Sequence, residues 1–329
     1  MADCFTLQQR LAFLRAQGSG VLAYSTLQPE LNYFDIAGIG YLAYYLFKHP
    51  IFARRGRRLV IGDPICRPEA LDDLLNQFLA TGPPAMFLQV GEAVAAHLYG
   101  RGRRVNQLGV ETDISLSDFT LDGKAKSRLR HWRNKALKEG VVISESPIDA
   151  MDRKEVAAVS ADWLSRKGHK ELLLLTRPLC YERETLVRYF WAHQKGKLIG
   201  MSVFDPLCRD NTVWGYYHNM VRLIQGAPHG TSDLMTLAAM ETFRAEGVRT
   251  LSFGLSPLTG ITVGKFRANV LTHVLLLLLY RYGQWLYPFA GNYSHKTAYC
   301  PVTRSVYVSG NHGNNILELI SVMKAIGIL

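Results

Sequence analysis

Short apolar segments typical of β-strands alternate along the whole chain with segments of helical periodicity, and they do so in two successive sets. The first set predicts strands over residues 20–27, 31–36, 58–61, 85–90 and 104–116, and helices over residues 69–80 and 92–99. The tyrosine-rich run at residues 41–47 fits either a strand or a buried helix. This mixture indicates an α/β (α+β) fold.

The second set has the same mixed character. It predicts helices over residues 124–139, 150–166, 182–193, 232–246 and 315–326, and strands over residues 141–145, 197–205, 212–221, 248–253 and 305–308. A short apolar segment lies at residues 171–175. The most apolar stretch, residues 270–280, contains His273 and is too short to span a bilayer, so we expect a buried strand or a core helix there.

Two related α/β units explain this organisation. A length of 329 residues is long for one core and sufficient for two. We place the boundary near Leu121-Asp122-Gly123, which gives units 1–122 and 123–329. No G-x-G-x-x-G motif follows a strand, so we expect mixed, largely antiparallel central sheets flanked by helices and not a Rossmann sheet.

Cysteine usage and the N-terminus indicate a cytoplasmic location. The five cysteines are scattered, with no C-x-x-C pair and no Cys/His cluster at zinc spacing, which suits reduced thiols. The first residues lack a charged start followed by an apolar run, so no signal peptide is predicted. His131, His193, His218 and His229 show no metal spacing, and we expect no metal.

The formal net charge of +11 favours anionic partners, although it also fits simple colloidal solubility. Helix 124–138 carries seven Lys or Arg and no acid, with Leu129, Trp132 and Ala136 as an apolar seam. Its positive face can attract a nucleic-acid backbone or an anionic membrane surface, or be no more than solvated. Residues 54–58 form a second basic cluster.

Residues 214–258 predict a strand, a glycine-containing loop, a helix and a strand. The loop runs from Gln225 to Thr231, and free amides at the start of the following helix make an anion site, although a plain turn fits as well. This arrangement resembles the GNAT acyltransferase superfamily, with Pro228 where that family's first glycine is expected.

Several blocks in order carry a more specific resemblance. They are Ile61-Gly62-Asp63-Pro64, residues 128–135, Asp162-Trp163-Leu164, residues 227–234, Glu246-Gly247, residues 253–258 and residues 295–301. From about Leu59 onward the chain resembles the C-terminal catalytic domain of the bacterial phosphatidylglycerol lysyltransferases (the multiple peptide resistance factor family). Three positions depart from the family pattern: Asn219 replaces an Asp, Ala298 replaces a Lys and Val302 replaces a Trp.

The resemblance implies two tandem GNAT-like units, with the transfer site in the second. It also implies an aminoacyltransferase that moves an aminoacyl group from aminoacyl-tRNA, its co-substrate, to a lipid head group, with no cofactor. Full-length relatives carry membrane helices ahead of this domain and this chain has none, so another hydroxyl or amine acceptor stays open. We expect a cytoplasmic protein, with peripheral contact to the inner membrane face as one possibility.

Two residues are predicted to be catalytic. Asp233 can hold a cationic α-amino group or take a proton, and otherwise stabilises the helix start through the helix dipole. Lys296 can meet a phosphate or an oxyanion, and otherwise is a surface lysine. Arg222 can bind phosphate in a forked geometry or form a structural ion pair. The further predicted substrate-binding residues are Gln225, Gly226, His229, Gly230, Thr231, Ser232, Gly254, Ser256, Arg130 and Asn134.

Two other functions remain open at this point. One is an acyl-CoA-dependent (or acyl-carrier-dependent) N-acyltransferase of the GNAT type, which would use the same glycine loop. The other is a non-catalytic module that binds an anionic surface, for which the departures at Asn219 and Ala298 leave room.

Overall fold

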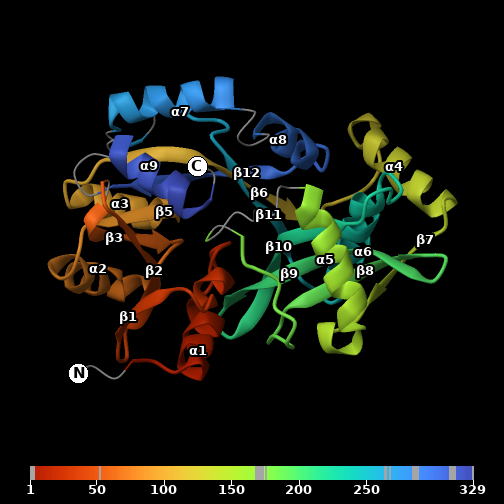
Figure 1. The fold of residues 1–329 in the computed structure, drawn as a ribbon, viewed down its shortest axis with the longest axis horizontal. Coiled ribbons are helices and arrows are strands. Elements are labelled where there is room, and N and C mark those ends of the chain that lie inside the picture. Colours follow the sequence, from red (N-terminus) through yellow and green to blue (C-terminus); the bar gives the residue numbers. More distant parts are fainter. Residues whose placement is uncertain are drawn as a thin grey trace.

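The computed structural model describes residues 4–51, 53–166, 174, 176–262, 265–266, 268–283, 289–310 and 316–327 (Figure 1). The elements up to residue 115 are α1 (Leu7–Gln17), the 3-10 helix η1 (Tyr24–Leu27), β1 (Asn32–Ile36), β2 (Gly40–His49), β3 (Ala53–Ile61), β4 (Ile65–Cys66), η2 (Pro68–Ala70), α2 (Leu71–Ala80), β5 (Ala85–Val90), α3 (Glu92–Gly100) and β6 (Val105–Ser115). None of the described helices has the length and apolar character that crossing a membrane requires.

The second part of the chain continues in the same mixed manner. Its elements are η3 (Lys124–Lys126), α4 (Ser127–Lys138), β7 (Val141–Glu145), η4 (Ile148–Ala150), α5 (Arg153–Arg166), β8 (Arg188–Gln194), β9 (Lys197–Arg209), β10 (Thr212–Leu223), α6 (Thr231–Ala245), β11 (Thr250–Pro257), α7 (Val270–Tyr282), α8 (Phe289–Thr297), β12 (Val302–Ser309) and α9 (Ile316–Ala325).

The described strands form one twelve-stranded sheet in the order β1-β2-β3-β5-β12-β6-β11-β10-β9-β8-β7, with β4 paired to β2. Two of the described pairs are parallel, β3 with β5 and β10 with β11, and the others are antiparallel. Helices α2 and α6 make the two parallel crossovers, one in each half of the sheet. This confirms the mixed α/β class, including the predicted strand, loop, helix and strand around α6.

The late strand β12 lies in the middle of the sheet. It pairs with β5 on one side and with β6 on the other, so residues 302–309 join strands from the beginning of the chain. The predicted boundary at residues 122 and 123 therefore separates strands that are hydrogen-bonded neighbours in space. The division into two units stays a prediction.

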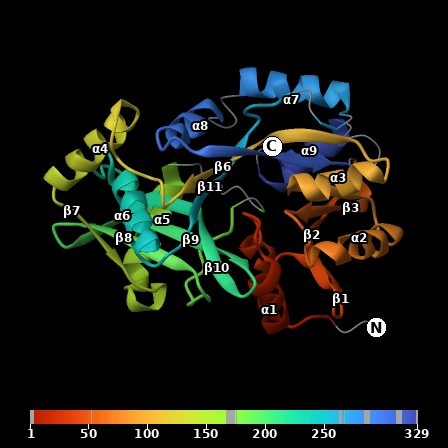
Figure 2. The same cartoon turned by 180° about the vertical axis from the view of Figure 1, so that it is seen from behind.

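Helices cover both faces of the first half of the sheet (Figure 2). Because alternate residues of a strand point to opposite faces, Val60 packs with Phe78 of α2, whereas Leu59 and Ile61 pack with the layer that contains Leu276 of α7. Helix α3 belongs to the first of these layers and α9 to the second. This half is therefore a three-layer sandwich with two apolar cores.

The second half repeats the three layers. Helix α6 packs Phe243 against Phe204 of β9, with 5.4 Å between the ring centroids. On the opposite face Val203 packs with Val159 of α5 and with Leu14 of α1. The N-terminal helix α1, which we did not predict, thus contacts the second half of the sheet.

Two element predictions are wrong. Residues 20–27 form turns and the helix η1 instead of a strand, because Thr26 bonds locally to the Ala23 carbonyl (2.6 Å) and is buried. The helix predicted over residues 182–193 is strand β8 from Arg188 onward, because Phe190 and Trp191 pack between β7 and β9. Of the apolar segment predicted at 171–175, only Leu174 lies within the described residues.

The structure settles the secondary structure of two segments that fitted either a strand or a helix. Residues 41–47 belong to strand β2. Residues 270–280 belong to helix α7, but the helix is not a fully buried core helix, because Val270 and Leu271 are 75% and 69% exposed. Helix α8 was not predicted.

Candidate active site

Helix α8 delivers Lys296 to the end of strand β11. The side chain is buried, and its Nζ donates to the carbonyl oxygens of Gly254 (3.2 Å) and Leu255 (2.7 Å). Burial lowers the pKa of Lys296 to about 7, against the opposing charge of Glu111. A lysine with this pKa offers both an ammonium and a neutral amine at physiological pH, which suits a residue that transfers protons.

Asp233, on helix α6, lies in the same cluster. The hydroxyl of Tyr299 donates to Asp233 Oδ1 at 2.7 Å, and His295 Nε2 lies 4.0 Å from the same oxygen. Burial, with Asp233 next to it, raises the pKa of Tyr299 well above its usual value, so its hydroxyl stays a donor. Asp233 therefore forms a buried polar contact with Tyr299, two residues past the end of α8, and does more than stabilise the start of α6.

Strand β11 supplies two residues with special geometry. A β-bulge separates Ser252 from Gly254, where φ is 64° and a Cβ atom would lie 2.4 Å from the ring of Tyr217. Two residues further, Ser256 is fully buried, and its Oγ has no hydrogen-bond partner among the described residues. A buried hydroxyl without a partner is unusual in a folded protein and is consistent with a site that a ligand completes.

His218 of β10 adds a second open polar atom. Its Nε2 is buried and has no hydrogen-bond partner in the described part of the chain. Burial, and then the charges of His295 and Lys296, lower the pKa of His218 to about 3, so the ring is neutral at physiological pH. We considered this histidine only for metal binding; nothing in the sequence placed it beside α8.

Two further acids have raised pKa values, the buried Glu111 of the neighbouring strand β6 and Asp63, which follows β3. Burial raises the pKa of Glu111 to about 7, although Gln89 Nε2 donates to its Oε1 at 2.8 Å and Arg304 lies 3.3 Å from its Oε2. Burial likewise raises the pKa of Asp63 to about 6. The negative charge of Glu111 opposes the fall in the pKa of Lys296, so this acid and this lysine, which both titrate near neutrality, influence each other.

Comparison with known protein families shows to which family the chain belongs. The sequence model described as "Phosphatidylglycerol lysyltransferase, C-terminal" matches residues 12–309. The chain belongs to this family. A phosphatidylglycerol lysyltransferase of Bacillus subtilis is 24% identical over 306 residues, covering 91% of this chain and 34% of the relative. A phosphatidylglycerol lysyltransferase of Staphylococcus aureus is 24% identical over 286 residues, covering 82% of this chain and 32% of the relative. The chain thus spans about a third of the length of these relatives.

Solved structures of this lysyltransferase family share the fold. L-PGS from Bacillus licheniformis superposes with a TM-score of 0.77 at 22% identity, covering 98% of this chain and 97% of the other. The C-terminal domain of a putative lysylphosphatidylglycerol synthetase from Agrobacterium fabrum gives a TM-score of 0.76 at 17% identity, with the same coverage. The family assignment confirms the resemblance of the sequence blocks.

In this member of the lysyltransferase family, the start of α6 packs against α4. Gly230 has a φ of 91°, and a Cβ atom there would lie 2.2 Å from the carbonyl oxygen of Trp132. Thr231 is fully buried, and both its amide (3.2 Å) and its Oγ1 (2.7 Å) donate to the carbonyl of Pro228. The expectation of a free amide at Thr231 is wrong, because the preceding turn uses it. Ser232 is half-buried.

The other loop residues lie toward α5 or toward solvent. Arg222 is buried, its Nη1 bonds to Ser160 Oγ, and its guanidinium lies 5.3 Å from the ring of Trp163. The Gln225 amide donates to Asp162 Oδ2 at 2.7 Å. Gln225, Gly226 and His229 are exposed, and none of them contacts the Lys296 cluster through an interaction described here. Their role in substrate binding stays a prediction.

Two predicted residues on α4 have local partners. Arg130 Nη1 donates to the carbonyls of Leu121 and Gly123 (2.7 Å to the latter), so it holds the connection between the two halves. Asn134 is exposed and accepts from Arg133 (3.2 Å). Neither residue lies in the buried cluster through these contacts, and their binding roles also stay predictions.

The departure at Asn219 fits its surroundings. Its Oδ1 accepts from the Arg177 amide and its Nδ2 donates to the Arg177 carbonyl, both at 3.2 Å. An aspartate cannot donate the second bond. Arg177 in turn is buried between Asp205 and Glu184, with contacts of 2.6 Å to each. Asn219 therefore fixes this segment to β10, a role the sequence did not reveal.

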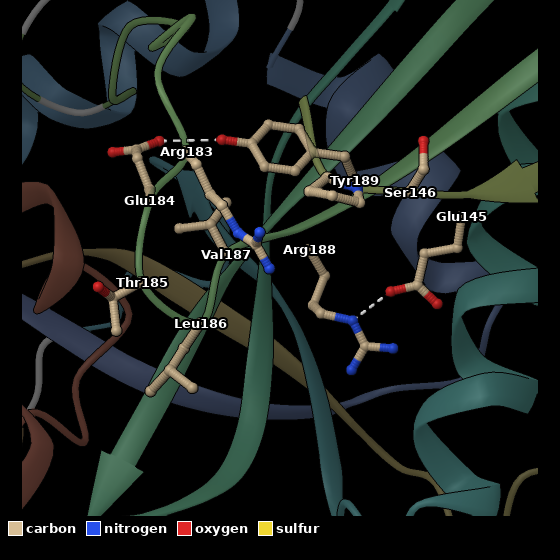
Figure 3. A pocket seen from close by; sticks show the side chains of 10 residues that line it. Glu145, Ser146, Arg183, Glu184, Thr185, Leu186, Val187, Arg188 and Tyr189 are labelled. Carbon is tan, nitrogen blue, oxygen red and sulfur yellow. Dashed lines mark hydrogen bonds and ion pairs between the residues drawn. The ribbon is translucent and has the colours of Figure 1, made fainter. Parts of the chain in front are cut away.

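A pocket of about 600 Å³ opens elsewhere, beside β7, β8 and residues 183–187 (Figure 3). Its charged groups already have partners, since Arg188 pairs with Glu145 and Glu184 accepts from Tyr189 at 3.1 Å. We prefer the Lys296 cluster as the active site because it combines a buried lysine whose pKa is near 7 with the open hydrogen-bonding atoms of Ser256 and His218. Among the described residues, no group of three His, Cys, Asp or Glu is arranged to hold a metal.

Proposed function

We propose that this chain transfers an aminoacyl group from aminoacyl-tRNA to the hydroxyl or amine of a lipid head group, at the cluster around Lys296. The observation that carries the proposal is the buried Lys296, with a pKa of about 7, in a member of the phosphatidylglycerol lysyltransferase C-terminal family. The named activity of the relatives makes a lysyl donor and phosphatidylglycerol the first pair to test.

The transfer reaction requires little beyond positioning and proton transfer, because an aminoacyl ester is already activated. The acceptor oxygen or nitrogen attacks the ester carbonyl carbon, and the bond to the tRNA ribose oxygen breaks. Neutral Lys296 takes the proton from the acceptor and returns it to the departing ribose oxygen. Asp233 supplies the negative charge that suits the cationic α-amino group of the donor, and the hydrogen bond from Tyr299 fixes the position of that carboxylate.

Electrostatics supports both anionic partners. The chain carries a net charge of +11, and α4 is basic without an acid in its first turn. Because the proposed acceptor is a lipid head group, we infer that the protein binds the cytoplasmic face of the membrane as a peripheral protein. Phosphates of tRNA and of anionic lipids are both attracted to such a surface.

The test is transfer itself. Purified protein is mixed with phosphatidylglycerol vesicles and with tRNA charged with radiolabelled lysine, alanine or arginine, and labelled lipid is extracted. We expect one donor to give labelled lipid, and Lys296→Gln to reduce the rate at least about a hundredfold. Lys48→Gln, an exposed lysine on β2, is the matched control and should leave the rate unchanged.

Two outcomes would overturn the proposal. If no charged tRNA is consumed but acyl-CoA raises the melting temperature, the chain is an acyl-CoA-dependent transferase. If vesicles or tRNA bind equally to wild type and Lys296→Gln and nothing turns over, the chain is a binding module.

A further inference from the structure

Helix α7 is apolar around most of its circumference, although only one side faces the protein. Thr272 and Leu276 are buried, and Leu275, Leu279 and Tyr280 pack against the core that contains α9. A globular protein normally places a helix that is apolar all round in its interior. The outer side of α7 therefore needs an explanation.

The outer side is an apolar strip that is interrupted only in the last turn, by Arg281. Its members have exposed fractions between 42% and 75%: Val270 (75%), Leu271 (69%), Val274 (45%), Leu277 (42%), Leu278 (48%) and Tyr282 (64%). At about 100° per residue, these six positions fall within an arc of about 140° on the helix surface. Soluble monomers rarely expose apolar side chains in such a contiguous patch, which marks an interaction surface.

The composition of the strip favours lipid over a protein partner. The six side chains are aliphatic apart from a terminal tyrosine, and α7 contains no acid. Its last turn carries the exposed Arg281 beside Tyr282. Aliphatic side chains flanked by an aromatic residue and a cation are the pattern of helices that lie in a membrane interface. Protein interfaces are instead enriched in several aromatic residues, Met and Arg.

Positive charge lies along the same edge of the molecule. In both overall views α8 lies beside α7, and the basic helix α4 follows along that edge (Figures 1 and 2). Arg128 of α4 donates to the Ser294 carbonyl of α8 at 3.1 Å, which ties the two helices together. Arg128, Lys124 and Lys138 are exposed. An apolar helix and a basic helix on one edge complement a bilayer with anionic head groups.

We propose that the outer face of α7 inserts into the surface of an anionic lipid bilayer, with the helix lying in the plane of the interface. The helix has 13 residues, about 20 Å, against the roughly 20 residues that a span requires. The choice of lipid rests on the proposed function, and it places α8, which carries Lys296, beside the membrane surface from which the acceptor comes. The acceptor head group then reaches the site without leaving the bilayer.

Vesicle flotation tests this docking without any transfer reaction. The full chain is mixed with vesicles of phosphatidylcholine containing phosphatidylglycerol, and with vesicles of phosphatidylcholine alone. The test variant is Leu271→Gln with Leu278→Gln, because glutamine is a good helix former and removes apolar surface only from the exposed side. The matched control is Leu7→Gln with Ile51→Gln, which are 58% and 73% exposed outside α7.

We expect wild type and control to float with the anionic vesicles, and the α7 variant to bind them at least about tenfold more weakly. Binding to neutral vesicles should be weaker than to anionic ones at low salt. Circular dichroism and the melting temperature check that the variant is folded. If it is not, Val270→Gln at the 75% exposed first position provides the same test.

Three results would overturn docking by α7. They are no flotation of wild type, equal flotation of the α7 variant and wild type, and a wild-type dimer that the α7 substitutions dissociate without changing flotation.

Transfer to a monomeric short-chain phosphatidylglycerol separates the two proposals. If docking is right and transfer is right, the α7 variant keeps this activity and loses activity on vesicles. If transfer is wrong, no variant is active and flotation still tests the docking.

Discussion

At the scale of single residues, burial gives ordinary side chains unusual proton affinities. Lys296 loses hydration inside the cluster and its pKa falls to about 7, while Glu111 loses hydration and its pKa rises to about 7. Both groups therefore titrate near physiological pH, which neither side chain does when it is exposed to water. His218 is held neutral beside them.

The pH dependence of transfer tests the role of Lys296. If its neutral amine is the proton acceptor, the rate rises between about pH 6 and pH 8 with an apparent pKa near 7. In Lys296→Gln this rise disappears together with most of the rate. A series of single-turnover rates with charged tRNA provides the measurement. An unchanged profile in the variant would show that another group sets the pH dependence.

The same displaced pKa affects stability, with a sign that follows from proton linkage. Folding lowers the pKa of Lys296 from 10.5 to about 7, so between these values the unfolded chain binds more protons. Lys296 therefore costs stability below pH 7, and this cost falls as the pH rises from 7 to 10.5. Wild type should gain stability relative to Lys296→Gln over this interval in urea unfolding. A constant difference between the two proteins would contradict the buried, low-pKa lysine.

At the scale of elements, the glycine loop before α6 serves packing as much as binding. Gly230 lets the helix begin against the backbone of α4, because its αL conformation and the nearby Trp132 carbonyl leave no space for a side chain. Gly226 also has a positive φ of 78°, but nothing lies within 4 Å of its Cβ position. A side chain at Gly226 would therefore meet backbone strain alone, whereas a side chain at Gly230 would meet both backbone strain and a steric clash.

Replacing each glycine by alanine should give different losses of stability. Gly226→Ala should cost about 1–2 kcal/mol, the strain of a left-handed non-glycine residue. Gly230→Ala should cost about 2–5 kcal/mol, because overpacking against Trp132 adds to the same strain. Chemical denaturation of both variants gives the comparison. Equal losses would show that α4 moves aside and that the contact carries no energy.

At the scale of the whole molecule, the central position of β12 links the two halves. Residues 302–309 pair with β5 and β6, and α1 from the N-terminus packs on β9. The predicted first unit lacks β12, the strand that lies between its own β5 and β6. The chain should therefore behave as one folding unit in spite of its two parallel crossovers.

This arrangement predicts a single unfolding transition in calorimetry, with equal calorimetric and van't Hoff enthalpies. A fragment of residues 1–122 should not fold by itself, because its β5 and β6 both lose their partner β12. Circular dichroism and proteolysis of the fragment provide the second measurement. Two separate transitions, or a stable fragment, would establish the domain boundary at residue 122.

Much of the architecture follows from local sequence, because strand and helix periodicity are local properties. The helix after the glycine loop, the antiparallel pair β9 and β10 and the mixed α/β class were predicted correctly, as was the family. The error at residues 182–193 arose where packing in the sheet outweighed local preference, and the error at residues 20–27 arose where Thr26 bonds locally to the Ala23 carbonyl. Periodicity also could not tell that the apolar run of α7 would lie half outside the protein.

The site depends on contacts between residues far apart in the chain. Sequence blocks pointed to Asp233 and Lys296, but not to the contact of Asp233 with Tyr299 or to that of Lys296 with the β11 carbonyls. Residue type sets what each group can donate or accept, and this is legible in the sequence. Proton affinity depends on how completely water is excluded and on which charges lie nearby, so the near-neutral pKa of Lys296 exists only once α8, β6 and β11 have packed together.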